Sequence, residues 1–203
     1  MRTSSTLAAL MGVGLIYSTW CGVVLAQWTL GAEVGSDRFW GGSVETTAER
    51  RSFRPYRPTT FGVRVERRQG RRLGAGLRLR YTSASLALEG ADAVVAAKGV
   101  FTVYSAAAEV IYRVMSVGSV NQLVLHLGPL FEVWSVIDEN SETRVGGQGA
   151  VSLNVPLGGR FGGSIMAGAA LISSPFGKDQ LDPGFERRAL WRRRFAVGLD
   201  YRL

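Results

Sequence analysis

The sequence has few residues that build metal or redox sites. It contains one cysteine, Cys21, and one histidine, His126, among 203 residues. A site made of several imidazoles is therefore excluded, and a metal would have to be held by carboxylates alone. No acidic segment has the ligand spacing of a calcium loop. We therefore expect no metal and no cofactor, and no disulfide bond beyond residue 26.

Long apolar runs are also scarce, because the only one lies at the start of the chain. A short, positively charged segment at 1–4 precedes an apolar stretch at 7–26, which ends in Val24-Leu25-Ala26. This is the pattern of a cleaved secretory signal peptide. An uncleaved membrane anchor is the alternative, and a lipid anchor on Cys21 a minor one. The sequence thus predicts a signal peptide at 1–26 and one domain at 27–203.

The net charge of +8 does not indicate a nucleic-acid-binding protein. The basic residues are nearly all arginine, and acidic residues recur between them along the chain. No strip of interleaved aromatic and basic residues, of the kind on which single strands stack, is visible. Nucleic acid is therefore not an expected partner.

What the chain does have is alternation of apolar and polar residues, which is typical of strands with one apolar face. The segment at 73–81 shows it most clearly, and the glycine- and alanine-rich segment at 160–172 least clearly. Frequent glycines within these runs suit a sheet whose inner face must accommodate large side chains. Eight such segments are predicted, at about 28–42, 59–68, 73–81, 100–115, 123–133, 148–155, 160–172 and 191–203.

The connections between these segments alternate in length. Those after the second, fourth and sixth segments are tight, whereas 43–58, 90–98, 138–144 and 173–188 are longer and polar. Outer-membrane barrels alternate in this way, with the short turns in the periplasm. The predicted fold is all-β, an eight-stranded antiparallel up-and-down transmembrane β-barrel.

The polar face of the predicted strands carries both signs of charge. In a membrane barrel these residues would line the lumen and pair with each other. Aromatic residues near both ends of the apolar face match interfacial girdles. A soluble, lipocalin-like periplasmic binder, with the apolar face inside, is the alternative fold. The predicted lumen network comprises Glu33, Arg64, Glu66, Arg78, Arg80, Glu109, Arg113, His126, Glu132, Arg192, Arg194, Asp200 and Arg202.

The carboxyl-terminal segment Gly198-Leu199-Asp200-Tyr201-Arg202-Leu203 carries a family resemblance. It resembles the terminal strand signal of outer-membrane barrels, although Leu203 replaces the usual phenylalanine and Ala196 stands where a polar residue is common. With the strand count, the whole of 27–203 resembles the OmpA/OmpX-like eight-stranded barrels. That resemblance implies the outer membrane of a Gram-negative-type bacterium, and recognition of Gly198, Tyr201 and Leu203 by the barrel assembly machinery.

Enzymatic chemistry has one candidate residue, His126, as a general base beside Glu132 or a serine. Barrel-shaped lipid A deacylases resemble the chain in architecture, but they carry a serine two residues after the histidine, where this sequence has Gly128. The sequence therefore favours a non-enzymatic protein, with a lipid-modifying enzyme as an alternative.

Basic residues gather in two of the predicted loops. Arginine can bind the phosphates of lipopolysaccharide bidentately. We expect a barrel with a side-chain-filled lumen whose loops contact lipopolysaccharide or external partners. A narrow channel for small or apolar solutes is the alternative, and the oligomeric state is left open. The expected lipopolysaccharide contacts are Arg50, Arg51, Arg54, Arg57, Arg187 and Arg188.

Overall fold

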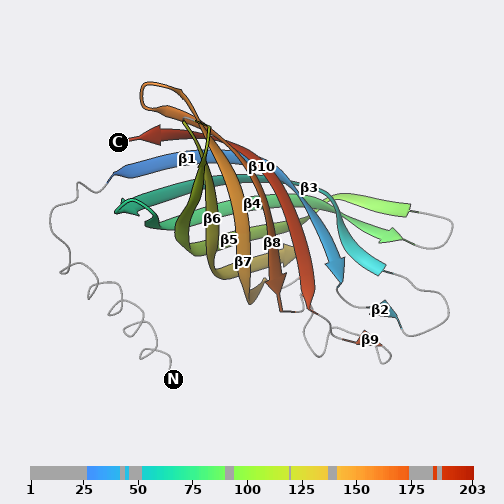
Figure 1. Cartoon of the computed structure of the whole chain (residues 1–203). Coiled ribbons are helices and arrows are strands. Elements are labelled where there is room, and N and C mark those ends of the chain that lie inside the picture. Colours follow the sequence, from blue (N-terminus) through green and yellow to red (C-terminus); the bar gives the residue numbers. More distant parts are fainter. Residues whose placement is uncertain are drawn as a thin grey trace.

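The structure, a computed structural model, describes residues 27–41, 44–45, 52–89, 94–118, 120–136, 141–173, 185–186 and 189–203 (Figure 1). The predicted signal peptide at 1–26 lies outside these residues. The described strands are β1 (Trp28–Gly41), β2 (Val44–Glu45), β3 (Ser52–Gln69), β4 (Leu73–Glu89), β5 (Val94–Val117), β6 (Asn121–Val136), β7 (Glu142–Gly158), β8 (Phe161–Ile172), β9 (Phe185–Glu186) and β10 (Leu190–Arg202).

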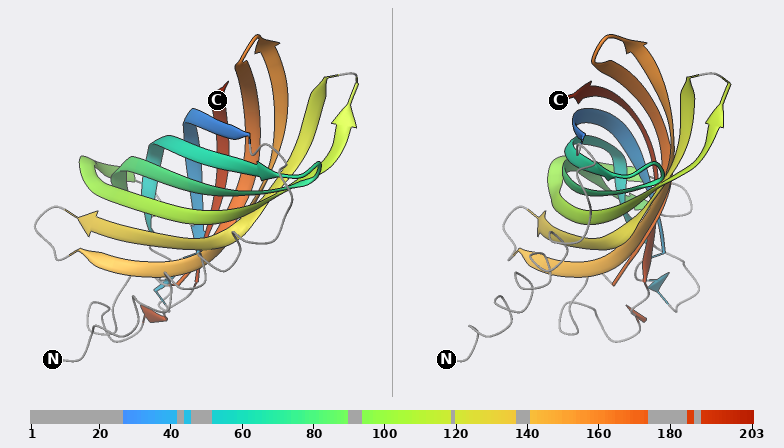
Figure 2. Two further views of the ribbon diagram at one scale, coloured as in Figure 1. Left: turned by 90° about the vertical axis from the view of Figure 1, so that its left-hand side faces the viewer. Right: turned by 60° about the vertical axis from the view of Figure 1, so that its left-hand side comes forward.

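Eight of these strands are long and close into a barrel. From β3 to β8 each long strand pairs antiparallel with the next, and β8 pairs with β10. The sheet closes because β1 pairs with β10 on one side and with β3 on the other. The curved wall can be followed from two sides in Figure 2. The predicted eight-stranded antiparallel up-and-down barrel is confirmed. None of the described residues forms a helix that is long and apolar enough to span a membrane.

The two ends of the barrel differ. At one end, here called the turn end, short turns connect β3 to β4, β5 to β6 and β7 to β8. Strand β1 begins at this end and β10 finishes there. Gly70 and Gly118 adopt φ values of 81° and 69° in these turns, a region that favours glycine. The opposite end, here called the loop end, carries the other connections. The short turns are the three that the sequence predicts.

At the loop end β3, β4 and β5 extend further than predicted. Pairing of β3 with β4 continues to Ser52↔Glu89, and pairing of β4 with β5 continues to Glu89↔Val94. Much of the loops expected at 43–58 and 90–98 is therefore strand. Pro58 hid the extension, because proline cannot donate to a ladder; the structure accommodates it in a register shift between Tyr56 and Thr59.

The outer wall is apolar, and the inner positions are polar over most of the barrel. Leu77, Val197 and Phe195 are at least half exposed on the outside. The expected aromatic residues lie on that outer face, with Phe161 packed on Tyr201 near the turn end and Tyr81 on Tyr104 towards the loop end. The soluble alternative required the reverse arrangement and is wrong.

Candidate functional site

The inside of the barrel is the candidate site, because it holds most of the charged residues of the described strands. Two residues of the predicted lumen network, Arg113 and Arg202, lie near the turn end and are only half-buried. The other predicted residues are buried: Glu33, Arg64, Glu66, Arg78, Arg80, Glu109, His126, Glu132, Arg192, Arg194 and Asp200.

Glu33 on β1 is the centre of the ion pairs. Its Oε2 atom lies 2.6 Å from Nη1 of Arg78 and 3.5 Å from Nη1 of Arg64, and its Oε1 atom lies 3.2 Å from Nε of Arg80. One carboxylate thus contacts three guanidinium groups from two neighbouring strands. A charge removed from water in this way is tolerated only when partners and hydrogen bonds compensate it.

Towards the turn end, Arg64 holds a second group of acidic residues. Its Nη2 atom donates to both carboxylate oxygens of Asp200, at 2.5 and 2.6 Å, and to Oγ of Ser164 at 2.9 Å. Its Nε atom lies 3.2 Å from Glu66. A Cβ atom at Gly31 would lie 2.5 Å from Asp200 and 2.7 Å from Nε of Arg64. The glycine therefore makes room for this ion pair.

On the opposite wall, Glu109 of β5 contacts four side chains, one of which is Arg80, with Nη2 3.7 Å from Oε1 of Glu109. Nε of Arg78 lies 2.9 Å from its Oε1 atom, which also accepts a hydrogen bond of 2.6 Å from Nε2 of Gln148. Its Oε2 atom lies 3.2 Å from Nδ1 of His126. On the far side of the ring, Nε2 of His126 is 2.9 Å from Oγ of Ser152. The prediction that Glu132 is the acidic partner of His126 is wrong, because Glu132 lies further along β6 and Glu109 occupies that place.

Towards the loop end, Asp37 and Glu132 bind two arginines of β10, Arg192 and Arg194. Arg194 donates from Nε and Nη2 to the two oxygens of Asp37, each at 2.7 Å. Arg192 lies with Nη1 2.6 Å from Glu132 and with Nε 3.8 Å from Asp37. Glu132 also accepts from Oγ of Ser105 at 2.8 Å. Both carboxylates are almost completely buried.

An apolar cluster lies among the lumen-facing residues nearest the loop end. Trp134 packs edge-on against Phe39, with ring centroids 6.0 Å apart, and its Nε1 donates to Glu132 at 2.9 Å. Val103 and Leu130 have no exposed surface. The cluster consists of Phe39, Ala84, Val103, Ala107, Leu130, Trp134, Ala170, Ile172 and Leu190. The sequence analysis did not predict it, although Leu130 and Trp134 continue the inner face of His126 with period two.

The order Ser152, His126, Glu109 is that of a Ser-His-acid triad. A hydrolase also needs a path by which substrate reaches the hydroxyl. Ser152 is 1% exposed and His126 is 2% exposed, so both side chains are almost completely enclosed in the lumen. The absence of a serine after His126 also has a structural reason, since a Cβ at Gly128 would lie 1.8 Å from the carbonyl oxygen of Ala108.

Sequence reasoning missed two charged lumen residues, Arg68 and Asp37. Asp37 lies two residues beyond Gly35 on the same face as Glu33, so continuing the alternation of the first segment would have found it. Gln148, Ser152 and Ser164 likewise stand on inward positions. No group of three or more His, Cys, Asp or Glu residues suited to a metal ion occurs among the described residues.

The residues of the other two predicted sites are placed only in part. Tyr201 packs against Phe161 with ring centroids 5.2 Å apart, and Leu203 is exposed. Arg54 and Arg57 lie on β3, not in a loop as expected, because β3 begins at Ser52. Their side chains lie outside the described part of the structure, as do Arg50, Arg51, Arg187 and Arg188 entirely.

A closed eight-stranded barrel with an apolar outer wall and a charged interior is the architecture of small outer-membrane β-barrel proteins. Solved structures agree. Neisserial surface protein A superimposes with a TM-score of 0.59 at 9% identity, covering 87% of this chain and 97% of that one. OprG from Pseudomonas aeruginosa gives 0.56 at 13% identity, covering 88% and 96%.

A major outer membrane protein from Thermus thermophilus superimposes with a TM-score of 0.50 at 12% identity, covering 87% of this chain and 99% of that one. No family model and no curated protein matches the sequence. These superpositions show a shared fold at low sequence identity. The shared fold confirms the resemblance to small outer-membrane barrels and supports the predicted location in the outer membrane.

Proposed function

We propose that this chain, after removal of residues 1–26, is a non-enzymatic outer-membrane barrel with a closed lumen, whose loop end contacts lipopolysaccharide or external partners. The observation that carries the proposal is the filled interior. Arg78 is 1% exposed among Glu33, Glu109 and His126, and the apolar cluster with the fully buried Leu130 lies nearer the loop end. An eight-stranded barrel is just wide enough for side chains to fill it.

The closed lumen predicts that the purified barrel will not conduct ions. In planar bilayers we expect no channel events above those of protein-free membranes. A double variant, Arg78→Ser with Glu109→Ser, removes one charge of each sign from the middle of the lumen and is expected to raise conductance. Steady openings of the parent protein would contradict the closed lumen and favour the narrow channel.

Support for lipopolysaccharide contact comes from arginines at the loop end. Arg54 and Arg57 lie on the part of β3 that extends beyond its pairing with β1. Arg38 and Arg193 lie directly opposite each other on β1 and β10, and both are exposed on the outer face. The guanidinium group of arginine can donate two parallel hydrogen bonds to phosphate oxygens. A hydrogen bond to a charged group contributes about 1.5–3 kcal/mol to the free energy of an interaction.

The double variant Arg54→Gln/Arg57→Gln is therefore expected to weaken lipopolysaccharide binding by roughly tenfold, since tenfold corresponds to about 1.4 kcal/mol. Binding would be measured with the barrel in nanodiscs. Arg67→Gln/Arg160→Gln removes the same charge at the turn end and should leave the affinity unchanged. Equal losses in both variants would point to net charge, and no loss in the first would contradict these contacts.

A further inference from the structure

Three arginines near the turn end of the lumen have no ion-pair partner within the described residues. The three are Arg68 of β3, Arg113 of β5 and Arg202 of β10. Each lies two residues after a buried lumen-facing residue of the same strand, and each is half-buried. Arg113 and Arg202 are close enough to Arg68 to repel it electrostatically. Three like charges thus converge from three strands.

The acidic residues nearest to them are engaged elsewhere. Glu66 lies 3.2 Å from Nε of Arg64, and both oxygens of Asp200 accept from Nη2 of the same arginine. Each acidic group therefore already contacts a buried cation. The positive charge of Arg68, Arg113 and Arg202 remains in excess, and partial burial strengthens their repulsion because the local dielectric is lower than in water.

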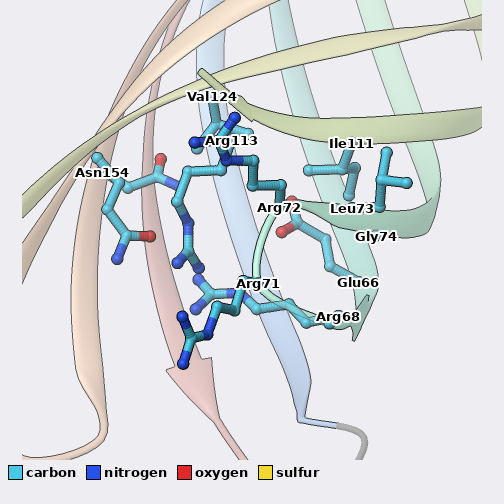
Figure 3. Close-up of a pocket in the computed structure, with 12 residues that line it drawn as sticks. Glu66, Arg68, Arg71, Arg72, Leu73, Gly74, Ile111, Arg113, Val124 and Asn154 are labelled. Atoms are coloured by element: carbon cyan, nitrogen blue, oxygen red, sulfur yellow. The ribbon is translucent and has the colours of Figure 1, made fainter. Parts of the chain in front are cut away.

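A hollow opens beside these arginines, and Figure 3 shows Arg68, Arg71 and Arg113 between Asn154 and Glu66. A second hollow, lined by Arg202, shares Glu66, Arg68 and Asn154 with the first. The enclosed space of each is about 20 Å³, which is room for little more than one water molecule. Asn154 lines both hollows. We call Arg68, Arg113, Arg202 and Asn154, with the two hollows, the turn-end mouth.

We propose that the turn-end mouth binds the phosphate group of an anionic ligand. Guanidinium groups present paired donors that match phosphate oxygens, and phosphate can carry enough charge to offset several arginines. Each hollow is smaller than a phosphate group, so the anion lies against the arginine side chains at the mouth and the rest of a ligand stays outside. The layer formed by Arg64, Asp200 and Ser164 lies deeper in the lumen, so the anion is held at the mouth and does not pass through.

Two sources could supply this phosphate at the periplasmic side, where outer-membrane barrels place their short turns. One is inorganic phosphate or a small phosphate monoester in solution, and the other is the headgroup of an anionic phospholipid in the adjacent leaflet. The experiment uses the barrel in an alkyl glucoside detergent, which carries no phosphate. One arm titrates inorganic phosphate, and the other titrates phosphatidylglycerol in mixed micelles against phosphatidylcholine.

The test variant is Arg68→Gln/Arg113→Gln/Arg202→Gln. Its matched control, Arg67→Gln/Arg144→Gln/Arg160→Gln, removes the same charge outside the mouth. We expect at least one of the two probes to bind the parent and the control with affinities within twofold, and the test variant at least tenfold more weakly. Binding of phosphate identifies the soluble source, and binding of phosphatidylglycerol alone identifies the lipid.

Folding is checked by the boiling-dependent shift on a denaturing gel. Without ligand the test variant should resist unfolding about as well as the parent, because it loses the repulsion among the arginines together with the weaker attraction of Arg68 to Glu66 and Asp200. Arg113→Gln alone, with a smaller loss of binding, serves if the triple variant does not fold. Absence of binding of both probes to the parent, or full binding by the folded test variant, would overturn the proposal.

Discussion

Gly128→Val is expected to abolish formation of the folded barrel. A Cβ at this position would lie 1.8 Å from the carbonyl oxygen of Ala108 and 2.9 Å from its carbonyl carbon. These atoms belong to the backbone of β5, so no side-chain rotation relieves the collision, and β5 and β6 would have to separate. The measurement is the fraction of protein that runs as the compact band on an unboiled denaturing gel after refolding into detergent.

The matched control is Gly147→Val on β7, where a Cβ meets nothing within 4 Å. It should fold to the same extent as the parent. If Gly128→Val gave the parent's yield of compact band, the close approach of β5 and β6 would be wrong. Gly128→Ser is expected to fail for the same reason, so the serine of the barrel deacylases cannot be introduced into this wall without moving β5.

Glu33→Ala is expected to lower the free energy of unfolding by about 3–5 kcal/mol, the usual cost of removing one partner from a buried ion pair. The reason is that Arg64, Arg78 and Arg80 all contact this carboxylate, and each is buried. The variant leaves an excess of positive charge in the lumen. Denaturant titration in phospholipid vesicles, followed by tryptophan fluorescence, measures the difference.

Two controls locate the effect. Glu33→Gln keeps a hydrogen-bond acceptor but not the charge, so we expect a smaller loss. Val34→Ala changes the next residue, which faces outward and is 43% exposed, and should have little effect by comparison. A change of less than about 1 kcal/mol for Glu33→Ala would mean that water already screens these arginines.

The wall of the barrel follows from the sequence because each strand carries its own alternation. Val63, Leu79 and Val197 face outward because they share a period of two with apolar neighbours, whichever strands lie beside them. The same reasoning places Glu33 and Arg78 inside. It loses accuracy at strand ends, where Pro58 and a run of small residues hid the extension of β3, β4 and β5 at the loop end.

The pairing within the lumen could not be predicted in the same way. Arg64 binds Asp200, which is 136 residues away, and His126 binds Glu109 and not Glu132. Such choices depend on the stagger of each strand against its neighbours and on the width of the closed barrel. Neither is encoded in the alternation of a single segment. The unpaired arginines of the turn-end mouth become visible only when the partners of Glu66 and Asp200 are known.

The seam between β1 and β10 has a consequence for the order of assembly. The last strand brings Arg194 to Asp37, across 157 residues, and Asp200 to Arg64. Before β10 joins, Asp37 and Arg64 lack these strong partners and β1 has an unpaired edge. Pairing of β1 with β10 therefore completes the backbone ladder and these ion pairs at the same place. A chain stalled before this step exposes both an open edge and uncompensated lumen charge, the features by which an incomplete barrel differs from a finished one.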